Sequence, residues 1–181
     1  MRVFVLSPGR SGSATFAEAC KHMTNFTAGH ETRSGLVEER FDYPDSHIEA
    51  DNRLTWMLGG LSRASQPDDR YVWLQRDRNL VVESFLRRWE SSYRSNIIKA
   101  FAHGIIQRRS DWDDPEAVVR FYVETVEANI AEFVKERDHM IVRLGTPDFE
   151  SFWEWIGAEG DRHGALMKWA TVHNASPQAI E

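Results

Sequence analysis

The residues best suited to chemistry lie near the N-terminus, in the turn from Ser7 to Ser13. This turn follows the apolar run 2–6, which predicts a strand, and precedes the stretch 14–23, whose apolar residues recur at the helical period. A strand that turns through glycine into a helix leaves the first backbone N–H groups of the helix unpaired and directs its positive dipole end at one point. Such a turn favours binding of an anion, most often a phosphate.

The turn lacks two parts of a loop that binds nucleoside triphosphates. Such loops carry Gly-Lys-Ser/Thr at the start of the helix, whereas this chain has Gly12, Ser13 and Ala14. The lysine that reaches the β- and γ-phosphates and the hydroxyl that holds Mg²⁺ are therefore both missing. The cation is Arg10, two residues before Gly12. The turn predicts a phosphate-like ligand that is bound without a metal.

A second anion site is indicated by Arg76 and Ser84. Arg76 follows the apolar run 71–74, which predicts a strand, and Ser84 interrupts the apolar face of a helix expected over 79–93. A guanidinium and a hydroxyl placed in this way can converge on one phosphate. The alternative is that Arg76 pairs with a carboxylate such as Asp77 and that Ser84 is a small packing residue.

Together the two sites resemble those of the sulfotransferase family. Residues 7–13 resemble its 5′-phosphosulfate loop, and Arg76 with Ser84 is similar to its 3′-phosphate motif. The resemblance extends to the strand and helix expected at 139–156. It implies an α/β, three-layer P-loop NTPase-like fold with a central parallel sheet covered by helices. It also implies transfer of a sulfuryl group from 3′-phosphoadenosine 5′-phosphosulfate to a hydroxyl or amine, without a metal.

The resemblance also assigns roles to residues. Arg10 would steady the leaving phosphate oxygen, while Arg76 and Ser84 would hold the 3′-phosphate. The residues that would hold the 5′ end of the nucleotide are Pro8, Gly9, Arg10, Ser11, Gly12, Ser13, Ala14 and Thr15. Ala14 departs from the family, which usually has a second hydroxyl residue there. The product would be 3′-phosphoadenosine 5′-phosphate.

The group that takes the acceptor's proton is expected at His30 or Glu31. In members that share this loop, a glutamate soon after the first helix often serves, which favours Glu31 over His30. A carboxylate near its ordinary pKa of about 4.3 is a poor base at neutral pH, so Glu31 would need desolvation. The alternative is a solvated loop pair without a role, and Glu49 and Asp51 are then the reserve candidates.

Strands and helices alternate along the chain, which predicts a parallel sheet with helices on both faces and ligands at the carboxyl ends of the strands. One domain, 1–181, is expected. The further strands are expected at 27–31, 47–50 and 139–144, and the further helices over 51–61, 114–137 and 146–157.

Composition limits the classes of partner. The 28 acidic and 22 basic side chains leave a net charge of -6, which argues against general affinity for nucleic acid or an anionic membrane. The single cysteine, Cys20, allows no internal disulfide and predicts a buried thiol. The N-terminal apolar run is far shorter than the roughly 20 residues of a membrane span, so a cytoplasmic protein is expected.

Three functions are compatible with these patterns. The first is a sulfotransferase that acts on a carbohydrate or small metabolite. The second is a P-loop kinase or nucleotide hydrolase, which the missing lysine disfavours. The third is a non-catalytic nucleotide-binding module of the same fold.

The remaining expectations concern the acceptor and the surface. The arginine-rich run 87–109 is either a contact for an anionic acceptor or a solvated helix face. Trp155 and Trp169, expected to be exposed, would suit a homodimer contact or an acceptor platform. The basic, glycine-containing segment with which many sulfotransferases close over the nucleotide has no clean copy, and 160–164 is the nearest candidate.

Overall fold

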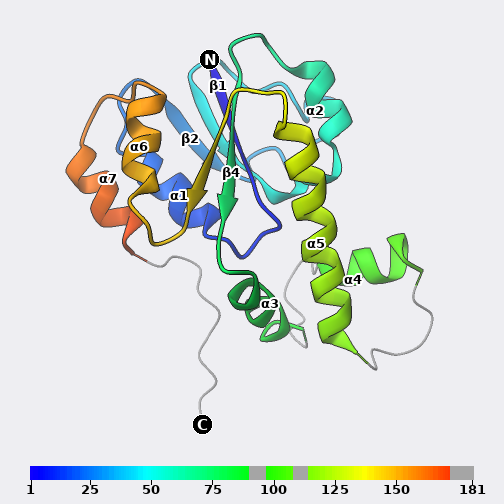
Figure 1. The fold of residues 1–181 in the computed structure, drawn as a ribbon. Coiled ribbons are helices and arrows are strands. Elements are labelled where there is room, and N and C mark those ends of the chain that lie inside the picture. The colour runs from blue at the N-terminus through cyan, green and yellow to red at the C-terminus, as the bar shows by residue number, and fades with distance from the viewer. Residues whose placement is uncertain (90–96, 108–113, 172–181) are drawn as a thin grey trace.

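The computed structural model describes residues 1–89, 97–107 and 114–171. In these residues, a five-stranded parallel sheet in the order β2-β3-β1-β4-β5 lies at the centre of the molecule (Figure 1). Its strands are β1 (Arg2–Leu6), β2 (Thr27–His30), β3 (His47–Ala50), β4 (Arg70–Gln75) and β5 (His139–Arg143). The parallel sheet expected from the alternating pattern is therefore confirmed.

Helices cover both faces of this sheet (Figure 1). One face carries α1 (Ser13–Cys20), α6 (Asp148–Trp155) and α7 (Arg162–Trp169). The other carries the 3₁₀ turn η1 (Asn52–Trp56), α2 (Leu58–Ala64), α3 (Arg78–Leu86), α4 (Ile97–Ala100), the π-helical turn η2 (Phe101–Ile105) and α5 (Pro115–Val134). The side chains of β1 alternate between the two cores, as strand geometry requires. This arrangement confirms the three-layer α/β fold.

The sheet has a topological switch point between β1 and β4. These strands are neighbours, but the helix after β1 packs on one face and the helix after β4 packs on the other. The two connections therefore leave the carboxyl ends of β1 and β4 toward opposite faces of the sheet. The crevice between them is the position where α/β proteins bind ligands. Figure 1 shows the turn after β1 and the start of α3 at the same end of the sheet.

Helix α5 forms where the sequence predicts it. Asp114 caps it by accepting a hydrogen bond from the Ala117 N–H at 2.9 Å, and Pro115 occupies its first turn. The helical period predicts one buried apolar stripe on this helix, formed by Val118, Phe121, Tyr122, Val126, Ile130 and Phe133. All of these residues except Phe121 are buried; Phe121 is 52% exposed, so its placement in the stripe is wrong. The same periodicity predicts Leu80 on the apolar face of α3, but Leu80 is exposed.

Two helix boundaries also differ from expectation. The helix expected over 51–61 is divided into η1 and α2, because Met57 between them has a φ of -128° and interrupts the helical backbone. The helix expected over 79–93 ends at Leu86. Residues 90–93 of that prediction lie outside the described residues.

The C-terminal part contains α7, which the sequence patterns did not predict. Asp161 caps α7 by accepting from the Gly164 N–H at 2.9 Å. Trp169 is 6% exposed and stacks on Phe149 with ring centroids 5.1 Å apart, so the expectation of an exposed Trp169 is wrong. In the segment 160–164, the candidate for closing over the nucleotide, Gly160 forms a β-bridge with Met23, Asp161 caps α7, and 162–164 form the first turn of this helix.

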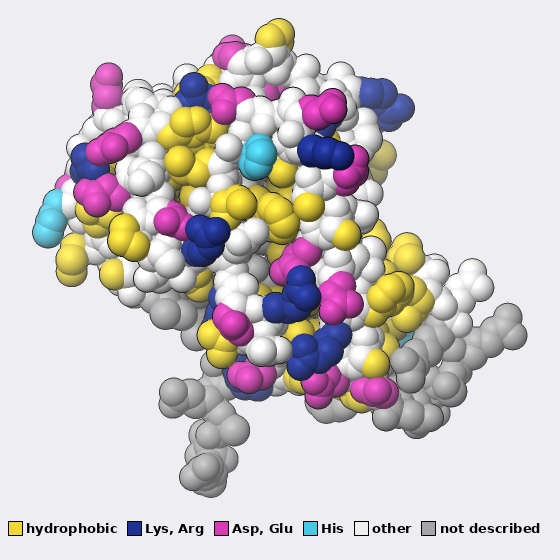
Figure 2. Space-filling view, in the orientation of Figure 1, with side chains coloured by type: hydrophobic (Ala, Val, Ile, Leu, Met, Phe, Trp, Pro, Cys, Tyr) yellow, Lys and Arg dark blue, Asp and Glu magenta, His cyan; other side chains and the backbone are white. Residues whose placement is uncertain are grey.

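Oppositely charged side chains are mixed on the face shown in Figure 2, where basic and acidic groups lie side by side over α3 and α5. The ion pairs there include Arg78 with Glu127 at 2.6 Å and Arg120 with Glu116 at 2.7 Å. Inside the molecule, Cys20 is fully buried as expected, and burial raises the pKa of its thiol. Of the helices described, none combines the length and apolar character that crossing a membrane requires.

Candidate functional site

The turn between β1 and α1 adopts a tight conformation that requires glycine. Gly9 and Gly12 have φ values of 88° and 94°, in the left-handed region that other residues rarely adopt. A Cβ atom on Gly9 would lie 2.5 Å from Nδ2 of Asn52. The turn also bonds to itself, because the Gly9 N–H donates to the Ser7 hydroxyl and the Ser11 hydroxyl donates to the Gly9 carbonyl, both at 3.2 Å. The predicted turn is thus a closely packed structure.

Arg10 is the point at which the two predicted anion sites meet. Its Nε donates to the Ser84 hydroxyl at 3.0 Å, and its carbonyl accepts a hydrogen bond from Nη1 of Arg76 at 3.1 Å. Arg10 itself has a φ of 58°, an uncommon conformation for a residue with a side chain. The structure therefore brings Arg10, Arg76 and Ser84 into one cluster, although 66 residues separate the two arginines.

Several cations gather around Arg10. Burial lowers its pKa to about 10, and repulsion from Arg88, Arg76 and Arg87 lowers it in the same direction. Arg87 is partly balanced by Glu83, at 3.7 Å. An anion bound beside Arg10 would relieve this repulsion and replace the hydration that burial removes. Arg87 and Arg88, the first residues of the arginine-rich run, therefore lie close enough to Arg10 to lower its pKa.

The first turn of α1 faces the same end of the sheet. Gly12 occupies the N-cap position, where no side chain caps the helix, and the first turn contains no acidic residue. The first N–H groups of a helix have no partner within the helix. Ser13 and Ala14 are the first residues of this turn.

Pro8 is held in place from the opposite face of the sheet. The hydroxyl of Tyr122, a fully buried residue of α5, donates to the Pro8 carbonyl at 3.0 Å. Burial raises the pKa of this hydroxyl, which keeps it protonated as a donor. The sequence patterns placed Tyr122 only in the apolar stripe of α5 and did not predict this contact.

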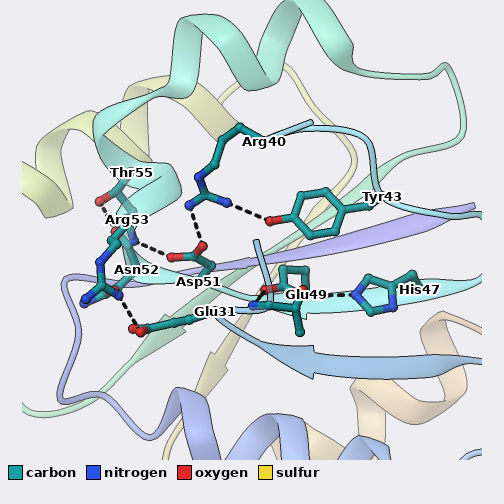
Figure 3. A network of polar contacts seen from close by, with 10 residues as sticks. Glu31, Arg40, Tyr43, His47, Glu49, Asp51, Asn52, Arg53 and Thr55 are labelled. Atoms are coloured by element: carbon teal, nitrogen blue, oxygen red, sulfur yellow. Dashed lines mark hydrogen bonds and ion pairs between the residues drawn. The ribbon is translucent and has the colours of Figure 1, made fainter. Parts of the chain in front are cut away.

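His30 and Glu31 lie at the end of β2, on the same side of the sheet as the turn. Nε2 of His30 lies 3.0 Å from the Ser13 hydroxyl, so its imidazole contacts the start of α1. Glu31 has a φ of 54°, and its carboxylate forms an ion pair with Arg53 (Figure 3). His30 thus contacts the turn directly, whereas the Glu31 carboxylate is paired with Arg53.

A buried network lies beside Glu31 (Figure 3). Asp51, which is fully buried, accepts from Arg40 Nη2 at 2.5 Å and from the Arg53 N–H at 2.8 Å. Arg40 also donates to the Tyr43 hydroxyl at 2.8 Å. Burial raises the pKa of Asp51, although Arg40 and the Arg53 N–H oppose this rise. The network continues through Arg53 to Glu31, so Asp51 acts here as a cap and an ion-pair partner.

Glu49 forms the other half of the network. Its two oxygens accept from the Thr32 N–H and from the Thr32 hydroxyl, both at 2.7 Å, and Oε2 lies 3.0 Å from His47 Nε2. His47 Nδ1 lies 2.7 Å from the Thr27 hydroxyl, and the Tyr43 ring stacks on the imidazole at 5.7 Å. Burial alone would raise the pKa of Glu49, but the hydrogen bonds from His47 and Thr32 outweigh it and lower that pKa.

The sequence contains one signal for this network. Glu49 and Asp51 lie in and directly after a short strand whose residues are all buried. A charged group in such a position needs a partner. Arg40 and Asn52 were not predicted as part of the site. The Oδ1 atom of Asn52 is buried and has no hydrogen-bond partner among the described residues.

In the parts of the chain that the structure describes, no group of three or more His, Cys, Asp or Glu side chains is arranged to hold a metal ion. Comparisons with protein-family models, curated proteins and solved structures give no match for this chain. The interpretation of the site therefore depends on its own geometry and on the sequence motifs.

Proposed function

We propose that the chain is a sulfotransferase that moves a sulfuryl group from 3′-phosphoadenosine 5′-phosphosulfate to a hydroxyl or amine of an acceptor. The observation that carries this proposal is the contact of Arg10 with both Arg76 and Ser84 at the switch point of the sheet. Two motifs far apart in the sequence, each suited to an anion, meet where an α/β sheet binds its ligand.

The chemistry of the donor set fits a nucleotide that carries several anionic groups. Guanidinium groups grip phosphate and sulfate oxygens through paired N–H donors, and Arg10 lies close to Arg76, Arg87 and Arg88. The uncapped start of α1 adds backbone N–H donors. Gly12 and Ser13 stand where a triphosphatase carries glycine and lysine, so a metal-bound triphosphate fits this turn less well.

In the proposed reaction the acceptor oxygen or nitrogen attacks sulfur, the bond from sulfur to the phosphate oxygen breaks, and a base takes the acceptor's proton. Arg10 and the N–H groups of α1 stabilise the charge that develops on the departing phosphate. Of the two predicted bases, the geometry favours His30, because its imidazole contacts Ser13 while Glu31 pairs with Arg53.

A transfer assay tests this proposal. The purified protein is incubated with sulfur-labelled donor and a panel of carbohydrate, phenol and amine acceptors, and both labelled product and released nucleotide are measured. We expect transfer to at least one acceptor and a loss of about 100-fold or more in kcat for Arg10→Gln. Arg63→Gln, at an exposed position of α2, is the matched control and should keep full activity.

Other results would favour the other interpretations. Tight binding of the nucleotide without transfer to any acceptor in the panel would favour a non-catalytic binding module. Consumption of Mg-ATP with no response to the sulfated donor would favour a kinase or hydrolase of the same fold.

A further inference from the structure

We propose that Glu49 is a positioning residue for His30, an inference that rests on the proposed function. The hydrogen bonds of the Glu49 carboxylate go to Thr32 and His47, and the side chain is fully buried. Its part is to fix the chain that follows β2, so that the His30 imidazole stays against the start of α1.

The first step of the argument is how Glu49 holds Thr32. Both carboxylate oxygens are used: Oε1 accepts from the Thr32 N–H, and Oε2 accepts from the Thr32 hydroxyl, each at 2.7 Å. Hydrogen bonds to an ionised acceptor are the stronger kind, and two of them to one residue fix its orientation as well as its position. Glu49 therefore clamps the chain two residues after His30.

The second step is how the clamp reaches His30. β2 pairs with β3 in a register that places Gly29 opposite Glu49 and His30 opposite Ala50. The chain then reverses at Glu31, whose N–H donates to the Ala50 carbonyl at 3.1 Å. A Cβ atom on Gly29 would lie 2.4 Å from Cγ2 of Thr32, so the reversed chain packs directly on β2. Because of this packing, any displacement of Thr32 is passed to the end of β2.

The third step is that the same short segment is held from its other side. The Glu31 carboxylate pairs with Arg53, whose N–H is bonded to Asp51, and Asp51 is paired with the buried Arg40 (Figure 3). Glu31, at the reversal, is thus connected through Arg53 to Asp51, and Thr32, the next residue, is bonded to Glu49. Such a doubly tied segment presents His30 in one orientation, at 3.0 Å from the Ser13 hydroxyl.

His47 also contacts the Glu49 carboxylate. Its Nε2 atom lies 3.0 Å from Oε2 of Glu49, and its Nδ1 atom lies 2.7 Å from the Thr27 hydroxyl. The Thr27 contact lies at the opposite end of β2 from His30, so its loss should leave the clamp on Thr32 intact. Thr27→Val is therefore a control variant that disturbs the same network without touching the part that we assign to positioning.

The experiment compares Glu49→Gln with Thr27→Val in the full chain. The glutamine keeps the size of the side chain, but it has a single acceptor oxygen and cannot accept from both the Thr32 N–H and the Thr32 hydroxyl, which use different oxygens of Glu49. We expect kcat for sulfuryl transfer to fall by about 10- to 100-fold in Glu49→Gln, since small displacements of a catalytic group have effects of this size. The Kd for 3′-phosphoadenosine 5′-phosphate should stay within about twofold, because the clamp does not form the anion site. Thr27→Val should change neither value.

A spectroscopic measurement separates this inference from the proposed function. In isotope-labelled protein, the imidazole nitrogen shifts of His30 should show one fixed tautomer in the wild type and averaging in Glu49→Gln. If Glu49→Gln does not fold, Thr32→Val replaces it in the test. Thr32 lies at an exposed position, and its change to valine removes only the hydroxyl contact with Glu49, which should lower kcat by about 3- to 10-fold. Unchanged His30 shifts and unchanged kcat in Glu49→Gln would overturn the inference. Absence of transfer in the wild type would overturn the proposed function instead, while the His30 shifts would still test the clamp.

Discussion

Replacing Arg76 by alanine should weaken the binding of 3′-phosphoadenosine 5′-phosphate far more than it destabilises the protein. A hydrogen bond to a charged group contributes about 1.5–3 kcal/mol, which corresponds to a loss of about 10- to 150-fold in affinity. In the absence of ligand, Arg76 contributes one bond to the Arg10 carbonyl but repels the Arg10 guanidinium. These effects oppose each other, so the free energy of unfolding should change by less than about 1 kcal/mol.

Arg70 provides the opposite pattern and serves as a control. It lies at the start of β4, donates to the Trp155 carbonyl, pairs with Asp138 at 3.0 Å and covers the Trp155 ring at 4.8 Å. Arg70→Ala should therefore lower the free energy of unfolding by about 1–2 kcal/mol, because it loses both the ion pair and the contact with the ring. The affinity for the nucleotide should stay unchanged.

Calorimetric titration and urea denaturation of the two variants measure both quantities. A change of less than about threefold in the affinity of Arg76→Ala would refute the assignment of Arg76 to the anion site. A large loss of stability in Arg76→Ala would show instead that this arginine is structural.

Three further predictions concern the turn and the buried network. Tyr122→Phe leaves the Pro8 carbonyl buried without its donor and should lower the free energy of unfolding by about 1–3 kcal/mol, measured by urea denaturation. A decrease smaller than about 0.5 kcal/mol would argue against this contact. Gly9→Ala places a Cβ 2.5 Å from Asn52 at a φ of 88°, so calorimetry should show at least about tenfold weaker nucleotide binding, and wild-type affinity would contradict the tight turn. Since the pKa of Glu49 is lowered from 4.5, the stability that it contributes is present above that pH and is lost as the pH falls. The difference in unfolding free energy between wild type and Glu49→Gln should therefore shrink as the pH falls below about 4.5, and a difference that grows there would contradict the lowered pKa.

The layered fold could be predicted because its elements carry strong local signals. β1 and β4 are short apolar runs that end in turns, and Asp114 with Pro115 marks the start of α5. Gly59 and Gly60 are a sequence signal for a weak helix after Met57, but residue types alone do not show that Asp51 caps only a 3₁₀ turn.

Misplaced apolar residues have a different cause. Periodicity identifies one face of a helix, but it does not show how much of that face is covered, and Phe121 and Leu80 lie where the covering is incomplete. α7 has a weak pattern of its own, and Trp169 is buried where it packs against Phe16 and Phe149. Such burial depends on tertiary contacts that one sequence does not display.

The candidate site shows the same division. The turn after β1 and the Arg76 motif could be read from residue type and spacing, but their meeting at Arg10 depends on the order of the strands. The clamp of Glu49 on Thr32 depends on the register between β2 and β3 and on the reversal at Glu31. A sequence indicates which charged groups need partners, and the folded chain determines which partners they find.

The most direct test of the central claim is calorimetric titration of the wild-type protein with 3′-phosphoadenosine 5′-phosphate in the presence of a chelator. A cluster built from Arg10, Arg76 and Ser84 predicts binding that is independent of Mg²⁺ and much tighter than that of ATP. Binding of Mg-ATP in preference to the 3′-phosphorylated nucleotide, or no binding of either, would contradict it.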